Sequence, residues 1–578
     1  MSAIQGNLGC GSSRKVETRN PKDLDVESEG AATLILSFVP SDDLSSPVLC
    51  TIRVGKERIP LSWPTEERIR NQIFFEFCGP KFEHFHIRSA NNMRKDLVGS
   101  KELKNAAPSR LPSYSAEMWW NYVDMWLAWA SAFCCHSTAF GFSIQGCVIQ
   151  AAIGAGYLGA AKTRRKELQK IRDDEAAGNP FGFLYHDIGA LETSAQERLP
   201  RVAVVMPLKG VGEFNLGNWR TQVTSLYGGE VEFLFVVESV EDPAYNAVSQ
   251  LLRELGDQVQ GRVIVAGLST TCSQKVHNQL AGVEAMHKDT KYVLFLDDDV
   301  RIHPGTIGSV VRDMEVNPKI FVLTGFPFDI PTQRCLKAYC IYEYHMPCSI
   351  GFGLTGGRTF FLWGGFMMMH AEDFRSNRYG LVSGLRYGGY SDDMTLAAVA
   401  AANKRIISSP PTTVFFHPLG RVNFKQYWNY LRKQSIVLET HITTVNYLMN
   451  RALFYSHCWL SWGLCIPYFT SLIHLLAILR FYCTSNPEFN PDIKTGLVVV
   501  GCTITSSLIE VLSMKRLSRV EIDLCNALSP ESPKVSIEPY DWFLGVMELV
   551  VNLSLQPFNK TVVVRGGDLH LLRDGKTS

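Results

Sequence analysis

Long apolar runs interrupt an otherwise mixed pattern of hydrophobic and polar residues, and the first run predicts a membrane anchor. The stretch from Met125 to Ala161 contains no Asp, Glu, Lys or Arg, and it exceeds the roughly 20 residues that a helix needs to cross a bilayer. Tryptophans stand at its start, and basic residues follow it at Lys162, Arg164, Arg165 and Lys166. The positive-inside rule therefore predicts a transmembrane anchor over 120–162 whose far end lies in the cytosol. The alternative is a buried core helix.

Two further charge-poor runs near the C-terminus predict a membrane hairpin. Ala452 to Leu479 contains no Asp, Glu, Lys or Arg, and the run from Thr495 to about Met514 contains only Glu510. Basic residues before the first run and after the second orient the pair as an outward and a returning helix within 452–515. A shorter apolar run, inside the final segment 540–578, is expected to lie in the membrane interface and to leave a basic tail in the cytosol. A membrane-spanning helix is the alternative for this run.

Between the anchor and the hairpin, residues 165–450 show short apolar runs separated by stretches long enough for a helix. These runs are Val202 to Leu208, Glu232 to Glu238, Arg262 to Gly267, Tyr292 to Asp297 and Phe321 to Thr324. Strands that alternate with helices imply βαβ units, so we expect an α/β domain with a mainly parallel sheet on the cytosolic side. Right-handed crossovers place the carboxyl ends of parallel strands at one edge of such a sheet.

The first 115 residues form a separate N-terminal extension. Two stretches alternate in hydrophobicity, Thr33 to Phe38 and Cys50 to Val54, and they indicate a small β-rich unit. We find no chemistry in this extension, so its role stays open. The orientation of the anchor predicts that it lies on the lumenal side.

Three consecutive aspartates end the fourth apolar run of the α/β domain. Asp297 and Asp299 lie two residues apart, so in an extended segment their side chains share a face. Two carboxylates on one face suit Mg²⁺ or Mn²⁺ bound together with a diphosphate. The side chain of Asp298, between them, is expected to turn away. A plain acidic loop after a strand is the alternative.

Polar groups also follow two other predicted strands. Pro207-Leu-Lys-Gly-Val211 follows the first strand, and Glu238-Ser-Val-Glu-Asp-Pro243 follows the second. Open α/β sheets bind ligands outside the carboxyl ends of their strands. Three strand ends with polar groups therefore predict one site at this edge more firmly than any single motif does.

Composition disfavours nucleic-acid binding and indicates the redox environment, and one apparent nucleotide-binding motif is misleading. Lys and Arg total 57 against 56 for Asp and Glu, so no net field attracts nucleic acid. Fifteen cysteines without a C-x-x-C pair indicate reduced thiols in a protein that faces the cytosol. The glycines Gly154, Gly156 and Gly159 spell G-x-G-x-x-G, but they lie inside the apolar anchor, where small residues favour close helix packing instead of nucleotide binding.

Several motifs of the α/β domain occur together in an order that resembles a known family. They are Pro207-Leu-Lys-Gly-Val211, Glu241-Asp-Pro-Ala244, Asp297-Asp-Asp-Val-Arg-Ile302, Trp363-Gly-Gly365 with Met367-Met-Met369, Gly389-Tyr-Ser-Asp-Asp-Met394 and Tyr427-Trp-Asn-Tyr-Leu-Arg-Lys-Gln434. The chain is similar, over about residues 200–450, to the family-2-like inverting glycosyltransferases with a GT-A (Rossmann-like) fold. Within them it resembles the plant-type ceramide glucosyltransferases of family 21.

This resemblance implies roles for single residues. Asp393 matches the catalytic base, and Asp297 and Asp299 match the metal motif. Residues expected to bind the nucleotide sugar are Asp242, Lys275, Asp297, Arg432 and Lys433. The expected acceptor region comprises Trp363, Gly364, Gly365 and Asp392. More ordinary roles stay open: Asp242 as a turn residue, Lys275 as a solvated helix lysine, and Asp392 or Asp393 as a helix N-cap.

The resemblance implies an integral, multi-pass protein of the endoplasmic reticulum or Golgi membrane that transfers glucose from UDP-glucose to ceramide with Mg²⁺ or Mn²⁺. The chain departs from the family at one motif: the Arg-Trp pair that follows the catalytic base is absent here. Arg432 and Lys433 keep positive charge in the corresponding stretch. This departure and the small number of C-terminal spans disfavour a polysaccharide synthase. A polyprenyl-phosphate or sterol glycosyltransferase and a catalytically dead membrane scaffold stay open as well. The oligomeric state is also open.

Overall fold

In the computed structural model the described residues are 24–25, 35–38, 49–54, 57–62, 116–179, 182–184, 199–387, 390–484, 489–534 and 555. The chain divides into two compact units, one spanning Asn7–Ser115 and the other Ala116–Ser578 with Met1–Gly6. In the smaller unit, four strands pair antiparallel in sequence order, β1 (Leu24–Asp25), β2 (Ile35–Phe38), β3 (Leu49–Val54) and β4 (Glu57–Ser62). The two alternating stretches of the extension thus fall on β2 and β3.

The larger unit is built on an eight-stranded sheet in the order β11-β13-β9-β12-β8-β5-β6-β7. Its strands are β5 (Val202–Pro207), β6 (Val231–Val237), β7 (Gln260–Val265), β8 (Tyr292–Leu296), β9 (Ile320–Thr324), β11 (Arg358–Thr359), β12 (Phe366–His370) and β13 (Ile406–Ser408). The pairs β5–β6, β6–β7, β5–β8 and β13–β9 are parallel. All five predicted strands are present, and the prediction of a mainly parallel α/β sheet is confirmed.

One central strand, β12, departs from the predicted parallel order because it runs antiparallel to both β8 and β9. Its first residue, Phe366, pairs with Leu296 at the end of β8. The start of β12 therefore lies at the same edge of the sheet as the end of β8. This reversal brings the segment before β12, Trp363-Gly-Gly365, beside the three aspartates.

Helices cover both faces of the sheet because alternate residues of its strands point to opposite sides. Along β5, Val202, Val204 and Met206 enter one hydrophobic core, and Ala203 and Val205 enter a second core. The first core includes residues of α6 (Asn215–Val223), α7 (Pro243–Leu255), α9 (Thr306–Val316) and α10 (Leu336–Gly353). The second includes residues of α8 (Gln274–Ala285), α11 (Ala371–Arg375), α12 (Leu381–Tyr387) and α13 (Asp392–Ala402).

A smaller parallel pair lies outside the main sheet, formed by β10 (Phe326–Pro331) and β14 (Val414–Leu419). Helix α14 (Phe424–Ile436) follows β14. Short 3-10 turns occur at Gly182–Leu184, Gly256–Gln258, Arg378–Gly380 and Val437–Glu439. This strand pair contributes one buried polar residue from each strand to the candidate active site described below, His417 from β14 and Asp329 from β10.

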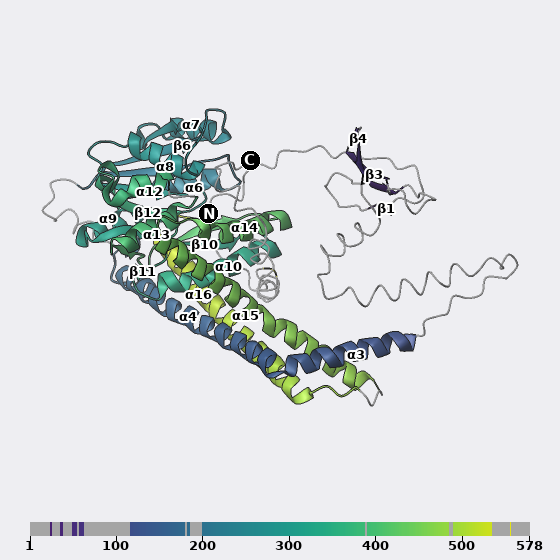
Figure 1. Ribbon diagram of the computed structural model, residues 1–578. Coiled ribbons are helices and arrows are strands. Elements are labelled where there is room, and N and C mark those ends of the chain that lie inside the picture. Colours follow the sequence, from purple (N-terminus) through teal and green to yellow (C-terminus); the bar gives the residue numbers. More distant parts are fainter. Residues whose placement is uncertain are drawn as a thin grey trace. The chain divides into compact units, whose positions relative to one another are not determined.

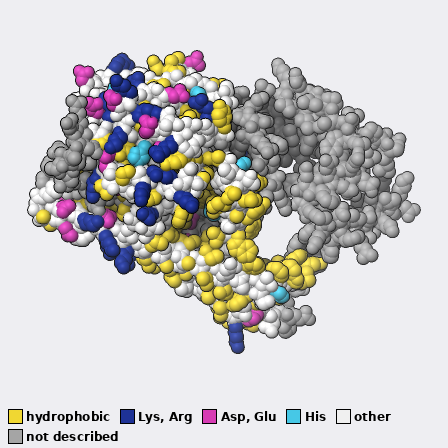
Figure 2. All heavy atoms as spheres, turned by 60° about the vertical axis from the view of Figure 1, so that its left-hand side comes forward, with side chains coloured by type: hydrophobic (Ala, Val, Ile, Leu, Met, Phe, Trp, Pro, Cys, Tyr) yellow, Lys and Arg dark blue, Asp and Glu magenta, His cyan; other side chains and the backbone are white. Residues whose placement is uncertain are grey.

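Long helices extend from this domain (Figure 1), and three of them are long and apolar enough to cross a membrane. These are α4 (Ser137–Ala176), α15 (Thr444–Cys483) and α16 (Ile493–Leu528). The predicted anchor over 120–162 is divided at His136, which separates α3 (Ala116–Cys135) from α4. Figure 2 shows hydrophobic side chains gathered on the helical part of the molecule, while charged side chains lie mainly over the sheet domain.

Helix α16 continues well past the predicted hairpin end at 515 and reaches Leu528. Leu517, Val520 and Cys525, in this added part, belong to the first core of the sheet domain. The same helix thus includes an apolar part and a part that packs on the sheet domain. The predicted interfacial segment 540–578 lies outside the described residues, apart from the single position 555.

Glycines allow α4 to pack closely against its neighbours, as the sequence predicts for the G-x-G-x-x-G motif. A Cβ added at Gly154 would lie 2.9 Å from Ile509 of α16. At Gly156 and Gly159, an added Cβ would meet Ile350 of α10 at 2.7 Å and Leu354 at 2.5 Å. These three glycines therefore serve helix packing.

Gly146→Ala should destabilise the helix bundle, because α15 leaves no space for a side chain there. An added Cβ would lie 2.1 Å from the backbone oxygen of Gly463 and 2.6 Å from Cγ of Pro467. We expect a loss of about 1–3 kcal/mol in unfolding free energy, as for other overpacked sites. It would appear as a lower melting temperature of the detergent-solubilised protein.

Gly141→Ala is the matched control on the same helix, since no atom lies within 4 Å of its added Cβ. Its melting temperature should be unchanged or slightly higher, because Ala favours helices over Gly. Equal destabilisation by both substitutions would contradict the packing of α4 on α15.

Candidate active site

Lys275 is the centre of a buried charge cluster at the carboxyl edge of the sheet. Its Nζ lies 2.9 Å from Oδ1 of Asp297 and 3.1 Å from Oδ2 of Asp392. It also donates to the backbone oxygen of Gly364 at 3.1 Å. The side chains of Asp297 and Asp392 are only 1% and 8% exposed. Burial alone would lower the pKa of Lys275, but the two carboxylates outweigh it and hold that pKa above its ordinary value.

The structure thus brings together residues that are far apart in sequence and were predicted separately. Asp297 follows β8, Lys275 lies in the first turn of α8, and Asp392 begins α13. The helix of Lys275 begins at Ser273, whose side chain caps it by accepting from the N–H of Val276. Lys275 is therefore not the solvated helix lysine of the more ordinary interpretation.

The glycines before β12 provide backbone where a side chain would block the cluster. The N–H of Asp297 donates to the oxygen of Gly365 at 2.9 Å. A Cβ added at Gly364 would lie 2.8 Å from Oδ1 of Asp392, and one at Gly365 would lie 2.2 Å from the ring of Trp363. The indole of Trp363 is itself buried and packs against Gly365. Its place in the acceptor region stays a prediction.

Helix α13 presents its two acids differently, and its N-cap is Ser391, not Asp392 or Asp393. The Ser391 side chain accepts from the N–H of Met394. Asp392 points into the cluster and accepts from Gln279 at 2.7 Å. Asp393 is half-buried, and its Oδ1 accepts from the N–H of Met394 at 2.7 Å and from the Ser391 hydroxyl.

The environments of these two acids move their pKa values in opposite directions. Burial would raise the pKa of Asp392, but Lys275 and the hydrogen bond from Gln279 hold it below its ordinary value. Burial and the neighbouring charge of Asp392 raise the pKa of Asp393. A pair separated in this way contains one permanent anion and one carboxylate better suited to accept a proton.

The other two aspartates of the triplet face different partners. Asp298 is buried and turns away, as predicted, to accept from Asn215 of α6 at 2.8 Å. Asp299 lies 3.3 Å from Nε2 of His417 on β14. Burial would raise the pKa of Asp299, but the imidazolium of His417 holds it below its ordinary value.

A buried polar chain leads from Asp299 to α14, and no sequence motif indicated it. Nδ1 of His417 hydrogen-bonds to Oδ1 of Asp329 on β10, whose Oδ2 bonds to Nδ1 of His345 on α10. Nε2 of His345 then bonds to the hydroxyl of Tyr430. The two histidines lower the pKa of Asp329 to about 2 against the effect of burial. The signal available in the sequence was a single acid or histidine inside an apolar run, at Asp329 and at His417.

His417→Gln should destabilise the domain, because Asp299 and Asp329 would lose the positive charge between them. We expect a loss of about 1–3 kcal/mol, the cost of leaving a buried polar group poorly satisfied. Burial would lower the pKa of His417, but the two aspartates raise it well above the ordinary value. Such a group stabilises the fold below its unfolded pKa and loses this effect as pH rises through its folded pKa. The variant's deficit in melting temperature should therefore be larger at pH 6 than at pH 9.

His287→Gln, at a histidine that is 44% exposed, is the control and should change the melting temperature little at either pH. A deficit of the His417 variant that grows with pH would contradict a charged His417.

Asp242 lies in the loop between β6 and α7 and joins this loop to the one that follows β5. Its Oδ1 accepts from the N–H of Gly210 at 2.8 Å and from the N–H of Ala244 at 2.9 Å, and it caps α7. The turn at Gly210 has φ of 67°, which favours glycine. The ordinary role as a cap is therefore present, and nucleotide binding by Asp242 stays a prediction.

Arg432 and Lys433, the two basic residues predicted to bind the nucleotide sugar, are adjacent on α14. Burial and the positive charge of Lys275 lower the pKa of Lys433, while Asp297 and Asp299 act in the opposite direction. Lys433 therefore lies within electrostatic reach of the cluster. Arg432 is half-buried on the same helix. Their binding of a nucleotide sugar stays a prediction.

Asp297 and Asp299 offer the carboxylate oxygens that Mg²⁺ and Mn²⁺ prefer, so the donor chemistry of the predicted metal site fits. Each already faces a positive group, Lys275 or His417. Among the residues that the structure describes, no group of three or more His, Cys, Asp or Glu could hold a metal. A metal held here by these two carboxylates would complete its coordination with oxygens of water or of a bound substrate.

Comparison with known proteins bears on the class of this site. Residues 181–341 match the model of glycosyl transferase family 21. The match covers 161 of 578 residues and includes Lys275 and Asp297 but ends before Asp393. It supports a glycosyltransferase domain, consistent with glycosyl transfer. No curated protein matches the chain.

Many solved structures are similar to parts of the chain, including the following two. One is a mannosyltransferase from Pyrobaculum calidifontis in complex with GDP-Man and Mn²⁺, with 12% identity and a TM-score of 0.33. That likeness covers 62% of this chain and 98% of the mannosyltransferase. The other is a mycobacterial protein with 14% identity and a TM-score of 0.27, covering 44% of this chain and 78% of the other.

Proposed function

We propose that the protein is a ceramide glucosyltransferase that transfers glucose from UDP-glucose to the primary hydroxyl of ceramide with inversion. The observation that carries this proposal is the convergence of Asp297, Lys275 and the pair Asp392–Asp393 at one edge of the sheet. The family match of residues 181–341 supports glycosyl transfer. The identities of the sugar and of the lipid rest on the resemblance of the motifs.

The donor side of the site would hold a nucleotide diphosphate. Lys275 and Lys433 supply positive charge toward it, and Asp242 would face the uridine at the neighbouring strand end. Asp297 and Asp299 would hold Mg²⁺ or Mn²⁺, and the metal would stabilise negative charge on the departing diphosphate. Asp392, anchored by Lys275 and Gln279, would keep Lys275 in place when the donor binds.

Asp393 is suited to act as the general base. Its carboxylate takes the proton of the ceramide hydroxyl while that oxygen forms a bond to the anomeric carbon of glucose. The bond from this carbon to the diphosphate oxygen breaks, and UDP leaves with the electron pair. Attack opposite the leaving group inverts the anomeric carbon, so α-linked UDP-glucose gives a β-glucoside.

The path of the acceptor is suggested by the connection between the base and the membrane. The N–H of Ser391, which caps the helix of Asp393, donates to Thr440 at 3.1 Å. Asn450 of α15 donates to the backbone oxygen of this same Thr440. Apolar side chains in the first turns of α15, before Asn450, are exposed, including Val445 at 67% and Leu448 at 61%. A lipid whose tail lies in the bilayer could therefore present a hydroxyl beside Asp393.

The arrangement of charges supports a cytosolic active site on an endoplasmic reticulum or Golgi membrane. Helix α4 carries Lys162, Arg164, Arg165 and Lys166 at the end of its apolar part, and the sheet domain follows directly. Positive residues at this end favour the cytosolic side. UDP-glucose dissolved in the cytosol would then reach the site.

Membranes that contain the protein, supplied with labelled UDP-glucose, a divalent cation and short-chain ceramide, test this proposal. We expect label in a glycolipid whose formation requires the cation. Labelled free glucose without glycolipid would reject ceramide as the acceptor, and label in a sterol or polyprenyl product would identify a different lipid. A donor preference for another nucleotide sugar would reject UDP-glucose.

A further inference from the structure

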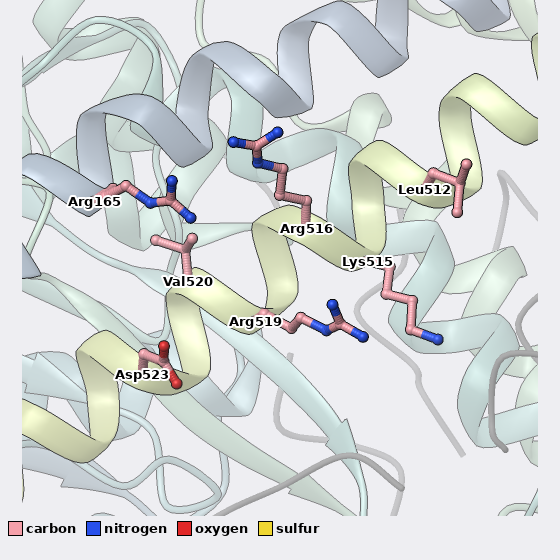
Figure 3. A pocket seen from close by; sticks show the side chains of 7 residues that line it. All are labelled: Arg165, Leu512, Lys515, Arg516, Arg519, Val520 and Asp523. Atoms are coloured by element: carbon pink, nitrogen blue, oxygen red, sulfur yellow. The ribbon is translucent and has the colours of Figure 1, made fainter. Parts of the chain in front are cut away.

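A basic hollow of about 600 Å³ lies between α4 and α16, and none of the residues that line it belongs to the candidate active site. It is lined by Arg165 of α4 and, on α16, by Leu512, Lys515, Arg516, Arg519, Val520 and Asp523. Figure 3 shows Arg165 extending from α4 toward α16, while Arg516 extends from α16 toward α4. Four basic side chains and one carboxylate therefore surround a space large enough for a small polar group.

Three of the four basic residues of this hollow have no counter-charge among the residues that the structure describes. Arg165, Arg516 and Arg519 form no ion pair or hydrogen bond with another of the described residues. The carboxylate of the hollow, Asp523, lies 3.6 Å from Arg172, which neutralises part of its charge. Guanidinium groups bind phosphate oxygens in a two-pronged geometry that suits such a space.

The hollow lies where the apolar surface of α16 ends. Leu508 and Leu512 are 44% and 56% exposed, and they lie one helical turn apart on the same face. Arg516 follows one further turn along this face. A molecule with an anionic head and hydrocarbon tails would find both kinds of surface in this order.

A buried ion pair fixes the two helices that form the hollow. Nε of Arg164 lies 2.7 Å from Oε1 of Glu521, which also accepts from Ser349 of α10 at 2.6 Å. Nη1 of Arg164 donates to the backbone oxygen of Pro411 at 2.7 Å. The adjacent residues Arg164 and Arg165 thus point in different directions, one into this ion pair and the other into the hollow.

We propose that the hollow binds the phosphate headgroup of an anionic phospholipid from the adjoining leaflet. The orientation of membrane helices alone requires basic residues near their ends, but it does not require them to surround a hollow. Lys162 and Lys166 serve that orientation at the same end of α4 and do not line the hollow. The proposal rests on α4 and α16 crossing the membrane and is independent of the proposed glucosyl transfer.

Native mass spectrometry of the full chain in neutral detergent, titrated with phosphatidylserine or phosphatidylcholine, tests the proposal. We expect tighter binding of phosphatidylserine and a loss of about fivefold in its affinity for each arginine removed in Arg165→Gln/Arg516→Gln. Lys162→Gln/Lys166→Gln removes the same charge from the same end of α4 and should bind as the wild type does. The charge-keeping variant Arg165→Lys/Arg516→Lys should retain most of the binding, which separates loss of the site from loss of the fold.

Equal binding of the two lipids by the wild type, or equal losses in the two Gln double variants, would overturn the proposal. Inorganic phosphate distinguishes the lipid from a soluble anion. Displacement of phosphatidylserine by millimolar phosphate would mean that a free phosphate occupies the hollow. Retention of the lipid under that condition is the expected result.

Discussion

Asp393→Asn should reduce glucosyl transfer by about 10²–10⁴-fold, the usual contribution of a general base. Asn has nearly the shape of Asp but cannot accept the proton of the attacking hydroxyl. The fold around it should persist, because an amide oxygen can still accept from the N–H of Met394 and from Ser391, as Oδ1 of Asp393 does. Initial rates with saturating donor and acceptor measure this loss.

Binding of UDP and the melting temperature are the controls for this variant, and both should stay close to the wild-type values. Asp257→Asn, at an exposed position of the same domain, removes the same charge and should leave the rate unchanged. Because burial and Asp392 raise the pKa of Asp393, the wild-type rate should fall on the acid side at a pH above the ordinary pKa of an aspartate. Transfer that survives the substitution would show that another group is the base.

Lys275→Met should impair both the stability and the activity of the protein. The substitution would remove the cation that both carboxylates contact. Asp297 and Asp392 would then stay buried without a positive partner at the former position of Nζ. Removal of one partner of a buried ion pair costs about 3–5 kcal/mol, and the rate should fall about 10²-fold, as for other lost electrostatic groups in active sites. The melting temperature and the transfer rate measure the two effects.

The pH dependence of this variant gives a separate check. Without Lys275, burial would raise the pKa of at least one carboxylate, and such an acid is most favourable to the fold when protonated. The variant's deficit in melting temperature should therefore be smaller at pH 4.5 than at pH 7.5. Lys288→Met, at an exposed lysine, should show no deficit at either pH. A Lys275 variant as stable as this control would contradict the charge cluster.

Much of the fold could be predicted because strong local patterns determined it. The apolar run before Asp297 is the strand β8, and the other four predicted strands occur within two residues of their expected ends. The long charge-poor runs correspond to α4, α15 and α16. These elements have their pattern in consecutive residues, so no knowledge of tertiary contacts was needed.

Other features depended on tertiary contacts that no local pattern indicates. The antiparallel direction of β12 depends on its neighbours β8 and β9, and it explains why Gly364 and Gly365 lie beside Asp297. The N-cap at Ser391 could have been weighed from its residue type, but the adjacent acids were equally plausible caps. The chain from Asp299 through His417 and Asp329 joins the loop after β8 to the strands β14 and β10, so only the assembled fold reveals it.

The most direct test of the proposed reaction is the anomeric configuration of its lipid product. The purified protein in nanodiscs with ceramide would be supplied with UDP-glucose and Mg²⁺ or Mn²⁺, and the product would be analysed by proton NMR. A single inverting displacement with Asp393 as base predicts β-glucosylceramide, absent when Asp393→Asn is used. An α-linked product, or a β-linked product formed equally by the variant, would contradict the proposed reaction.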